Sequence, residues 1–437
     1  MCYFYAKTLK IICNWCNIDF EFALTIGVKS INFLFGFRAS IRVRLAVMCL
    51  LRTLATSIFT FLLFVSLLFT GCVAGDHLVK SLYEGVVYHK IQMLEGPWWI
   101  HVVEVDIDVA RRSGVQFKVE SARNEIGGVQ RTSVMAGDAL AAVNGDFFYL
   151  LDSKLKTGIH VQDGQIFHEP QPRSAVVIQS DGSPLISKFN MELGFIKRSG
   201  ERVLINGLNR FPKTDEIVLF NNLAVSTYDS VFATIGFQLQ SLYRPSKYRV
   251  NDTLVVRVLQ ARRRAWPLAL DKDEWFLAAG HGHKEGRNIS PGDTLALFSN
   301  LDPAKMPVNQ ALGGGPRLLR DGEISVEFKT EGLSRAFAED RHPRTALGYS
   351  EGQQTLFLIA VDGRQPGYSV GMKLDELAKF MRFEIGKFMV GGEHVYQALN
   401  LDGGGSTTMV VGGVVVNAPS DQTGERAVAN AFLVTAN

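Results

Sequence analysis

The chain has 437 residues, of which 47% are hydrophobic and 20% charged, with 46 lysines and arginines against 43 aspartates and glutamates. This apolar content excludes a disordered or collagen-like protein, because it is enough to build a large core. Residues 1–71 contain seven basic and two acidic side chains, which leaves 39 basic and 41 acidic ones for residues 72–437. Most of the chain is thus close to neutral, and we expect no nucleic-acid partner.

The first 72 residues have the pattern of a targeting segment. Residues 54–70 are uncharged, follow three arginines, and precede Gly71 and Cys72. This order is typical of an export signal. Three alternatives stay open: lipidation of Cys72 as in a bacterial lipobox, an uncleaved membrane anchor, or a plain signal peptide. Each predicts an exported protein, periplasmic or in the cell envelope, and the first two predict attachment to the membrane.

Met48 would begin a signal peptide of ordinary length over residues 48–72, so we interpret residues 1–47 as an over-extended N-terminus. All five cysteines lie within the first 72 residues. No disulfide or cysteine-based zinc site can therefore form within residues 73–437.

The remaining chain is rich in predicted strands. From residue 83 onward, short β-rich runs alternate with Gly, Asn and Asp turns. The predicted strands cover residues 98–107, 175–179, 253–259, 294–298, 355–361 and 409–416. Leu374, Leu377, Ala378 and Met381 have helical spacing, with Ser369 as a candidate cap. A weaker helix is predicted over residues 131–140. The pattern predicts an α+β fold, strand-rich with a few covering helices, over residues 83–437, with residues 188–265 as an insertion or subdomain.

Four stretches combine glycine with polar residues at the ends of apolar runs. They are residues 144–148 (NGDFF), 313–317 (GGGPR), 342–364 (from HPRT to DGR) and 400–408 (NLDGGGSTT). Three consecutive glycines, Gly403–Gly405, let the main chain approach a ligand closely, and Ser and Thr hydroxyls follow them. A tight β-turn is the structural alternative. The run lacks the lysine of a phosphate-binding P-loop.

Charged side chains flank these stretches. Asp362 and Asp402 each follow an apolar run, where paired carboxylates can perform acid–base work or bind a metal. Asp-Gly is also a common turn dipeptide. Arg344 and Arg364 can bind phosphate, or form surface ion pairs. His281 and His283 have metal-compatible spacing without a third ligand, so we expect a loop or substrate contact at His281.

In their order along the chain these stretches resemble the phosphodiester glycosidase family. The matching segments are residues 142–148, 280–282 with 291–293, 313–317, 341–348, 361–365, 369–372, 400–406, and 416–421 with 425–426. Two residues depart from the family pattern: Thr407 stands where the family usually repeats Ser, and Asp146 stands where Gly is frequent. The resemblance implies a mixed α+β fold and cleavage of a sugar from a phosphodiester at the anomeric carbon.

These roles follow as expectations. Asp402 or Asp362 would act as base or nucleophile, while Arg344, Arg364 and the amides of Gly403–Gly405 would hold the phosphate. Asn144 and Asp146 would bind sugar hydroxyls. The remaining substrate contacts are expected from His281, Gly314, Asn400, Ser406 and Thr407. No cofactor is certain, although a divalent cation could bridge an aspartate and the phosphate.

The expected partner is a sugar-phosphate or polysaccharide of the cell envelope or its surroundings. A binding lipoprotein without catalysis would need the arginine and the glycine run but not both aspartates. Their joint presence favours an enzyme. A phosphodiesterase that breaks the P–O bond is a further alternative.

Overall fold

The structure is a computed structural model of the chain. It describes residues 75–124, 126–149, 158–225, 235–243, 249–263, 270–284 and 288–436. The predicted segments 1–47 and 48–72, with Cys72, lie outside these residues. Within them, no helix is both long and apolar enough to cross a membrane.

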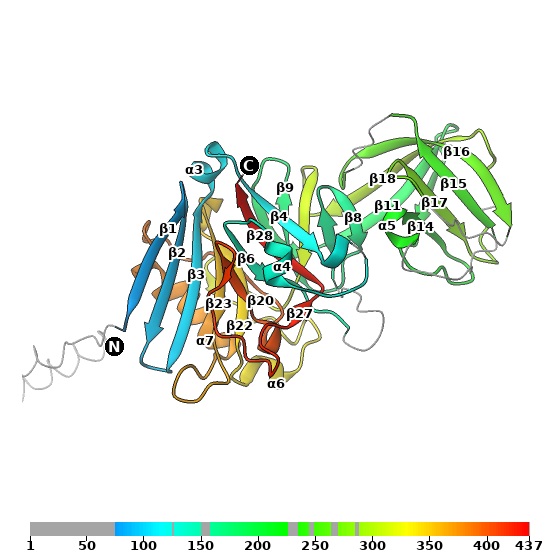
Figure 1. Ribbon diagram of the computed structural model, residues 1–437. Coiled ribbons are helices and arrows are strands. Elements are labelled where there is room, and N and C mark those ends of the chain that lie inside the picture. Colours follow the sequence, from blue (N-terminus) through cyan, green and yellow to red (C-terminus); the bar gives the residue numbers. More distant parts are fainter. Residues whose placement is uncertain are drawn as a thin grey trace, which may run out of the picture. The chain divides into compact units, whose positions relative to one another are not determined.

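The first sheet has eight strands in the order β1-β2-β3-β23-β22-β24-β20-β21 (Figure 1). Its strands are β1 (His77–Tyr83), β2 (Val86–Met93), β3 (Trp98–Asp106), β23 (Thr355–Val361), β22 (Arg344–Tyr349), β24 (Gln397–Asn400), β20 (Arg317–Arg320) and β21 (Glu323–Ile324). The predicted strands at 98–107 and 355–361 are confirmed as β3 and β23. Alternate residues of β23 enter two different cores: Leu356 and Leu358 pack on one side, Phe357 and Ile359 on the other. Because both faces are covered, this strand is apolar throughout.

Short helices complete this part of the fold. They are α3 (Ile107–Arg112), α4 (Thr132–Ala136), α5 (Asn222–Val225), α6 (Arg335–Glu339) and α7 (Leu374–Lys379), the last followed by a π-helical turn, Phe380–Glu384. The buried face of α7 contains Leu374, Leu377 and Ala378, as its spacing predicts. The predicted cap was wrong: Lys373 is the N-cap residue, and its amide donates to Glu376 at 2.9 Å. Helix α4 is shorter than the predicted 131–140.

A five-stranded sheet contains the chain's C-terminal strand in the order β26-β25-β6-β28-β4, and β27 pairs with β5 beside it. The strands are β26 (Val414–Val415), β25 (Met409–Val411), β6 (Ala141–Asn144), β28 (Asn430–Ala436), β4 (Val115–Ser121), β27 (Ala427–Val428) and β5 (Gln130–Arg131). The single strand predicted over 409–416 is divided into β25 and β26. Gly412 and Gly413 both have positive φ and form the turn of this hairpin.

Two further sheets share a core. The five-stranded sheet β10-β9-β19-β7-β8 consists of β10 (Pro184–Lys188), β9 (Ser174–Gln179), β19 (Val308–Gly313), β7 (His160–Gln162) and β8 (Gln165–His168). The eight-stranded sheet β12-β11-β18-β16-β15-β17-β14-β13 consists of β12 (Arg202–Ile205), β11 (Asn190–Lys197), β18 (Thr294–Asp302), β16 (Thr253–Arg263), β15 (Ile235–Ser241), β17 (Glu274–Ala279), β14 (Ile217–Asn221) and β13 (Gly207–Leu208). Its strands span residues 190–302, a wider range than the predicted insertion at 188–265, whose limits stay a prediction. The strand-rich α+β fold is confirmed.

Antiparallel pairing brings the polar stretches together at one end of the central strands of the first sheet. Strand β22 lies between β23 and β24, with Arg344 opposite Val361 and Ala346 opposite Asn400. The start of β22 therefore adjoins the ends of β23 and β24. The Gly315 amide donates to the carbonyl of Asn400 at 2.8 Å, which places the segment after β19 at the same end of these strands.

Candidate active site

Two carboxylates, Asp402 and Asp146, approach each other at this end of the strands. The Asp402 amide donates to the Gly145 carbonyl at 2.9 Å. The Asn144 side-chain amide donates to the Asp402 carbonyl at 2.7 Å. The Asp146 amide in turn donates to Asn430 at 2.9 Å. These bonds hold the chain after β24 against the chain after β6, residues more than 250 positions apart in the sequence.

Both carboxyls bind their protons more tightly than usual. Burial raises the pKa of Asp146 to about 7, and the nearby charge of Asp402 acts in the same direction against the opposing effect of Arg173. Burial also raises the pKa of Asp402 to about 6, although Ser406, the Gly403 amide, Arg426 and Arg173 lower it. Part of the Asp402 residue stays exposed, while its carboxyl is surrounded by protein. Near neutral pH the pair is therefore more protonated than two free aspartates would be.

The Asp146 side chain is tightly enclosed and only 1% exposed. Its Oδ1 accepts the Phe147 amide at 2.8 Å. Within the described residues, its Oδ2 has no hydrogen bond of normal distance and angle. The Gly158 amide is nevertheless near enough to lower the pKa of Asp146. A Cβ at Gly313 would stand 2.3 Å from Oδ2, so only glycine fits there.

Four cationic or basic side chains surround the pair and the following loop. The charge of Arg173 acts on both carboxyls, and its guanidinium lies 4.9 Å from the centre of the Phe147 ring. Arg426 forms an ion pair with Asp421 at 2.6 Å. Arg364 is exposed and contacts His342 Nδ1 at 3.2 Å. Burial and the charges of Arg344 and Arg364 lower the pKa of His342, so its ring is neutral at neutral pH. This arrangement suits an anionic ligand.

Two of the three glycine amides predicted to hold the phosphate are engaged within the protein. The Gly403 amide donates to Asp402 Oδ1 at 2.9 Å and the Gly404 amide to the Pro343 carbonyl at 2.9 Å, so neither amide is available to an anion. The glycines instead make room for guanidinium groups. A Cβ at Gly404, whose φ is +62°, would lie 3.0 Å from Arg364 Nη2, and one at Gly405 would lie 2.4 Å from Arg426 Nη2.

The Arg344 guanidinium donates its hydrogen bonds within the protein. The residue is 1% exposed, and its guanidinium donates to the carbonyls of Met372 at 2.8 Å, Phe337 at 2.8 Å and Asp340 at 2.9 Å. Burial, with the charge of Arg364, lowers its pKa to about 10. We therefore revise its predicted phosphate-holding role to a structural one.

This structural role predicts that Arg344→Met destabilises the protein. Three buried carbonyl groups would lose their donor, which corresponds to a loss of about 3 kcal/mol in the free energy of unfolding. Urea denaturation measures this loss. Arg341→Met is the matched control, because Arg341 forms an exposed ion pair with Glu376 and should change stability by less than about 1 kcal/mol. Equal effects of the two substitutions would contradict the assignment.

Asp362 is likewise occupied by internal donors. Its Oδ2 contacts His101 at 3.2 Å and accepts from Tyr368 at 3.1 Å, and its Oδ1 accepts from Asn417 at 3.2 Å and the Ala418 amide at 2.8 Å. The side chain is fully buried. Asp362 thus joins β3, β23 and the segment after β26, and we revise its predicted catalytic role to a structural one.

Other predicted contacts have mixed outcomes. The Asn144 side chain accepts from Thr345 and the Thr408 amide and donates to the Asp402 carbonyl, so it positions the loop instead of contacting a sugar. Gly314 is buried against the Asn400 carbonyl. His281 follows β17 in the sheet built from residues 190–302, whereas the carboxyls belong to other sheets.

Several side-chain oxygens of residues 400–408 are buried without a hydrogen-bond partner in the described part of the chain. Asn400 Oδ1, Thr407 Oγ1 and Thr408 Oγ1 are buried and accept or donate no hydrogen bond within the described residues. The Ser406 hydroxyl lies beside Asp402 and lowers the pKa of that carboxyl. The Ser406 oxygen itself has no hydrogen bond of normal distance and angle. Buried polar atoms usually have a partner, so these atoms are candidates for contacts with a ligand.

Sequence reasoning missed Arg173, Arg426 and His342 as site residues. Arg426 and His342 lie in stretches that match the family, which was a usable signal. Arg173 lies in no motif, and β9 brings it to the site from a distant part of the chain. Among the described residues, no group of three His, Cys, Asp or Glu side chains is placed to hold a metal ion.

Together, the fold and the site define a strand-rich α+β protein in which two buried carboxyls adjoin a group of arginines. Residues 270–435 match the phosphodiester glycosidase family, which confirms the resemblance seen in the sequence. The chain is 35% identical over 131 residues to mouse N-acetylglucosamine-1-phosphodiester alpha-N-acetylglucosaminidase, covering 28% of this chain and 23% of the mouse protein. It is 33% identical over 124 residues to the bovine enzyme of the same name, covering 26% of this chain and 21% of that protein.

The chain thus spans less than a quarter of the length of these relatives. Among solved structures, a hypothetical protein from Synechocystis superposes with a TM-score of 0.62 at 20% identity, covering 83% of this chain and 64% of that one. This likeness concerns the fold alone.

Proposed function

We propose that this protein hydrolyses a sugar-1-phosphodiester at the anomeric carbon. The observation that supports the proposal most is the buried Asp402–Asp146 pair, with both pKa values raised, beside Arg173, Arg364 and Arg426. The family match over residues 270–435 supports the same reaction class. The named activity of the mouse and bovine relatives makes N-acetylglucosamine-1-phosphodiesters the first substrates to test.

The chemistry divides between the two groups of side chains. The leaving group is a phosphate monoester with a second pKa of roughly 6, so it departs near neutral pH with little help from an acid. The arginines hold its negative charge. Asp402, whose carboxylate accepts the Gly403 amide and has Arg426 and Arg173 nearby, is the carboxylate that acts at the anomeric carbon. Asp146, which the protein encloses, keeps its proton to higher pH and so limits the negative charge beside Asp402.

In the hydrolysis, the bond between the anomeric carbon and the phosphate oxygen breaks and the electron pair leaves with the phosphate. Water supplies the new hydroxyl. Asp402 either takes the proton of that water or first bonds to the sugar, which are the inverting and retaining routes. Both routes need the same carboxylate.

Arg364→Ala is expected to raise KM by about 10- to 100-fold, with a smaller change in kcat. A charge-assisted hydrogen bond to the phosphate is worth about 1.5–3 kcal/mol, and binding loses it in both ground and transition states. Steady-state kinetics measures both constants. Arg364→Lys should recover part of the affinity, because the positive charge remains although the paired N–H donors of the guanidinium are lost. An unchanged KM in Arg364→Ala would remove this residue from phosphate binding.

The deciding experiment incubates the protein with α-N-acetylglucosamine-1-phosphodiester in ¹⁸O-labelled water, with and without chelator. Label on the released sugar supports cleavage of the C–O bond. Label on the phosphate would replace the proposal by a phosphodiesterase. Saturable binding without turnover of this and other sugar-1-phosphodiesters would favour the sugar-phosphate-binding protein. Loss of turnover with chelator would establish a metal requirement.

We also propose that the protein is exported and anchored by a lipid on Cys72, and that its substrate belongs to an envelope or extracellular polysaccharide or glycoconjugate. The charge pattern of residues 42–72 supports export. Mass spectrometry of the mature N-terminus tests both the lipid and the start of the chain.

A further inference from the structure

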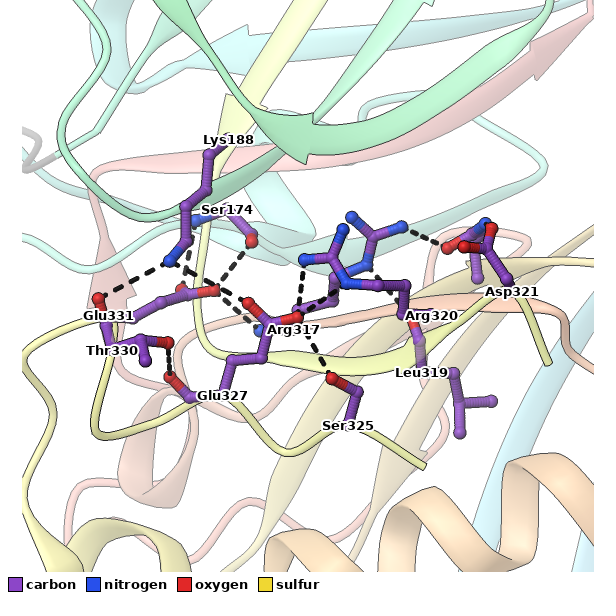
Figure 2. Close-up of polar contacts among 11 residues, drawn as sticks. Ser174, Lys188, Arg317, Leu319, Arg320, Asp321, Ser325, Glu327, Thr330 and Glu331 are labelled. Carbon is purple, nitrogen blue, oxygen red and sulfur yellow. Dashed lines mark hydrogen bonds and ion pairs between the residues drawn. The ribbon is translucent and has the colours of Figure 1, made fainter. Parts of the chain in front are cut away.

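A further buried carboxylate, Glu331, lies close to Arg173. It is 4% exposed and accepts three hydrogen bonds: from the Ser174 hydroxyl at 2.7 Å, the Ser174 amide at 3.0 Å and the Arg317 amide at 3.2 Å. Figure 2 shows its carboxylate between Ser174 and Arg317.

The donors belong to two segments that build the site. Ser174 begins β9 and directly follows Arg173, whose guanidinium lies 4.9 Å from the Phe147 ring, next to Asp146. Arg317 begins β20 and directly follows the segment in which Gly313 borders the Asp146 carboxyl. A Cβ at Gly315 would lie 2.9 Å from Glu331 Oε2 and 3.5 Å from Arg173 Cδ, so the three groups are in close proximity.

Other charges near Glu331 have different partners. Lys188 and Arg320 both pair with Glu327, at 3.8 Å and 2.5 Å. The Arg317 guanidinium donates to the Leu319 carbonyl at 3.1 Å and to Gln397. Within the described residues no ion pair involves Glu331. The contacts of its carboxylate are therefore with the main chain and one hydroxyl, which suits fixing a backbone position more than balancing a charge.

We propose that Glu331 is a positioning residue that holds Arg173 against the Asp402–Asp146 pair by anchoring Ser174 and Arg317. The proposal rests on the proposed function, because it assigns Arg173 a role in that site. Glu331→Gln keeps the size of the side chain but replaces one acceptor oxygen by an NH₂ group. That group cannot accept a bond from the donors of Ser174 and Arg317, so this anchor weakens and Arg173 shifts.

The expected consequence is a change in the titration of the carboxyl pair. The charged groups that act on Asp146 are Arg173 and Asp402, and those that act on Asp402 are Arg173 and Arg426. Arg173 lowers the pKa of both carboxyls. Displacement of Arg173 should therefore move the acidic limb of the pH profile of kcat/KM to higher pH, by about one pH unit.

The experiment compares Glu331→Gln with Glu327→Gln in the full chain. Glu327 lies in the same turn but bonds Arg320 and Ser325, so its substitution should leave the profile unchanged. Arg173→Met should give the same shift as Glu331→Gln, and the double variant should give no further shift. A Glu331→Gln profile equal to that of the wild type, or shifts that add in the double variant, would overturn the proposal.

Two measurements keep the test decisive. Carbon-13 NMR of labelled aspartate carboxyls reports the same upward shift without requiring turnover. If the wild type proves inactive, the proposed function fails while this titration still decides the role of Glu331. If Glu331→Gln does not fold, Ser174→Ala removes one of the three bonds and should produce a smaller shift in the same direction; no shift would overturn the proposal.

Discussion

Asp402→Asn is expected to lower kcat/KM for a verified sugar-1-phosphodiester by about a thousandfold, the size usual for loss of a general base. The amide keeps the acceptor for the Gly403 amide, so the loop should retain its conformation. It cannot take a proton from water or bond to the anomeric carbon. Binding should change little, because the arginines that hold the phosphate remain.

The measurement is steady-state kinetics with a thermal melt of each variant. Asp375→Asn is the matched control, since its carboxylate forms an exposed ion pair with Lys379 on α7. It should retain wild-type turnover. Near wild-type activity of Asp402→Asn would exclude Asp402 from the chemistry and leave Asp146 as the carboxylate to test.

Asp146→Asn is expected to stabilise the protein at pH 8 and to change its stability much less at pH 4. In the folded state the pKa of Asp146 rises from 3.8 to about 7. A carboxyl with a raised folded-state pKa favours folding below its unfolded pKa and loses that contribution as pH rises through the folded pKa. Over the window from about pH 4 to 7 the wild type should lose on the order of 4 kcal/mol from this group.

Asparagine has no ionisable carboxyl group, and its side-chain oxygen can still accept a hydrogen bond from the Phe147 amide. Urea denaturation at several pH values measures the difference between the two proteins. Asp108→Asn is the control, because that exposed carboxylate pairs with Arg111 at the surface and should leave the pH dependence unchanged. A stability difference between the wild type and Asp146→Asn that is the same at pH 4 and pH 8 would show that Asp146 ionises at its ordinary pKa.

Much of the fold could be predicted because its signals are local. Strand β23 is an uninterrupted apolar run since both of its faces are buried, and α7 shows helical spacing since one face is buried. The polar stretches at 144–148, 313–317 and 400–408 were found because glycine beside polar residues at a strand end is visible without the third dimension. Asp402 and Arg364 came from the same signal.

The roles within the site required tertiary structure. Asp362 and Asp402 look alike in the sequence, each before a glycine, yet Asp362 is surrounded by His101, Tyr368, Asn417 and Ala418 whereas Asp402 faces another carboxyl.

The arginines show the same division. Arg344 begins β22 and Arg364 follows the paired strand β23, and only their surroundings show that the first donates to buried carbonyls while the second is exposed beside Gly404. The sequence by itself determined which segments form strands and where polar residues follow them, because these properties depend on neighbours along the chain. Only the packing of the sheets decided which of those residues are occupied by internal partners, and that Arg173 and Glu331 join them from other segments of the chain. Hydrogen-bond partners and burial depend on neighbours in space, not along the chain.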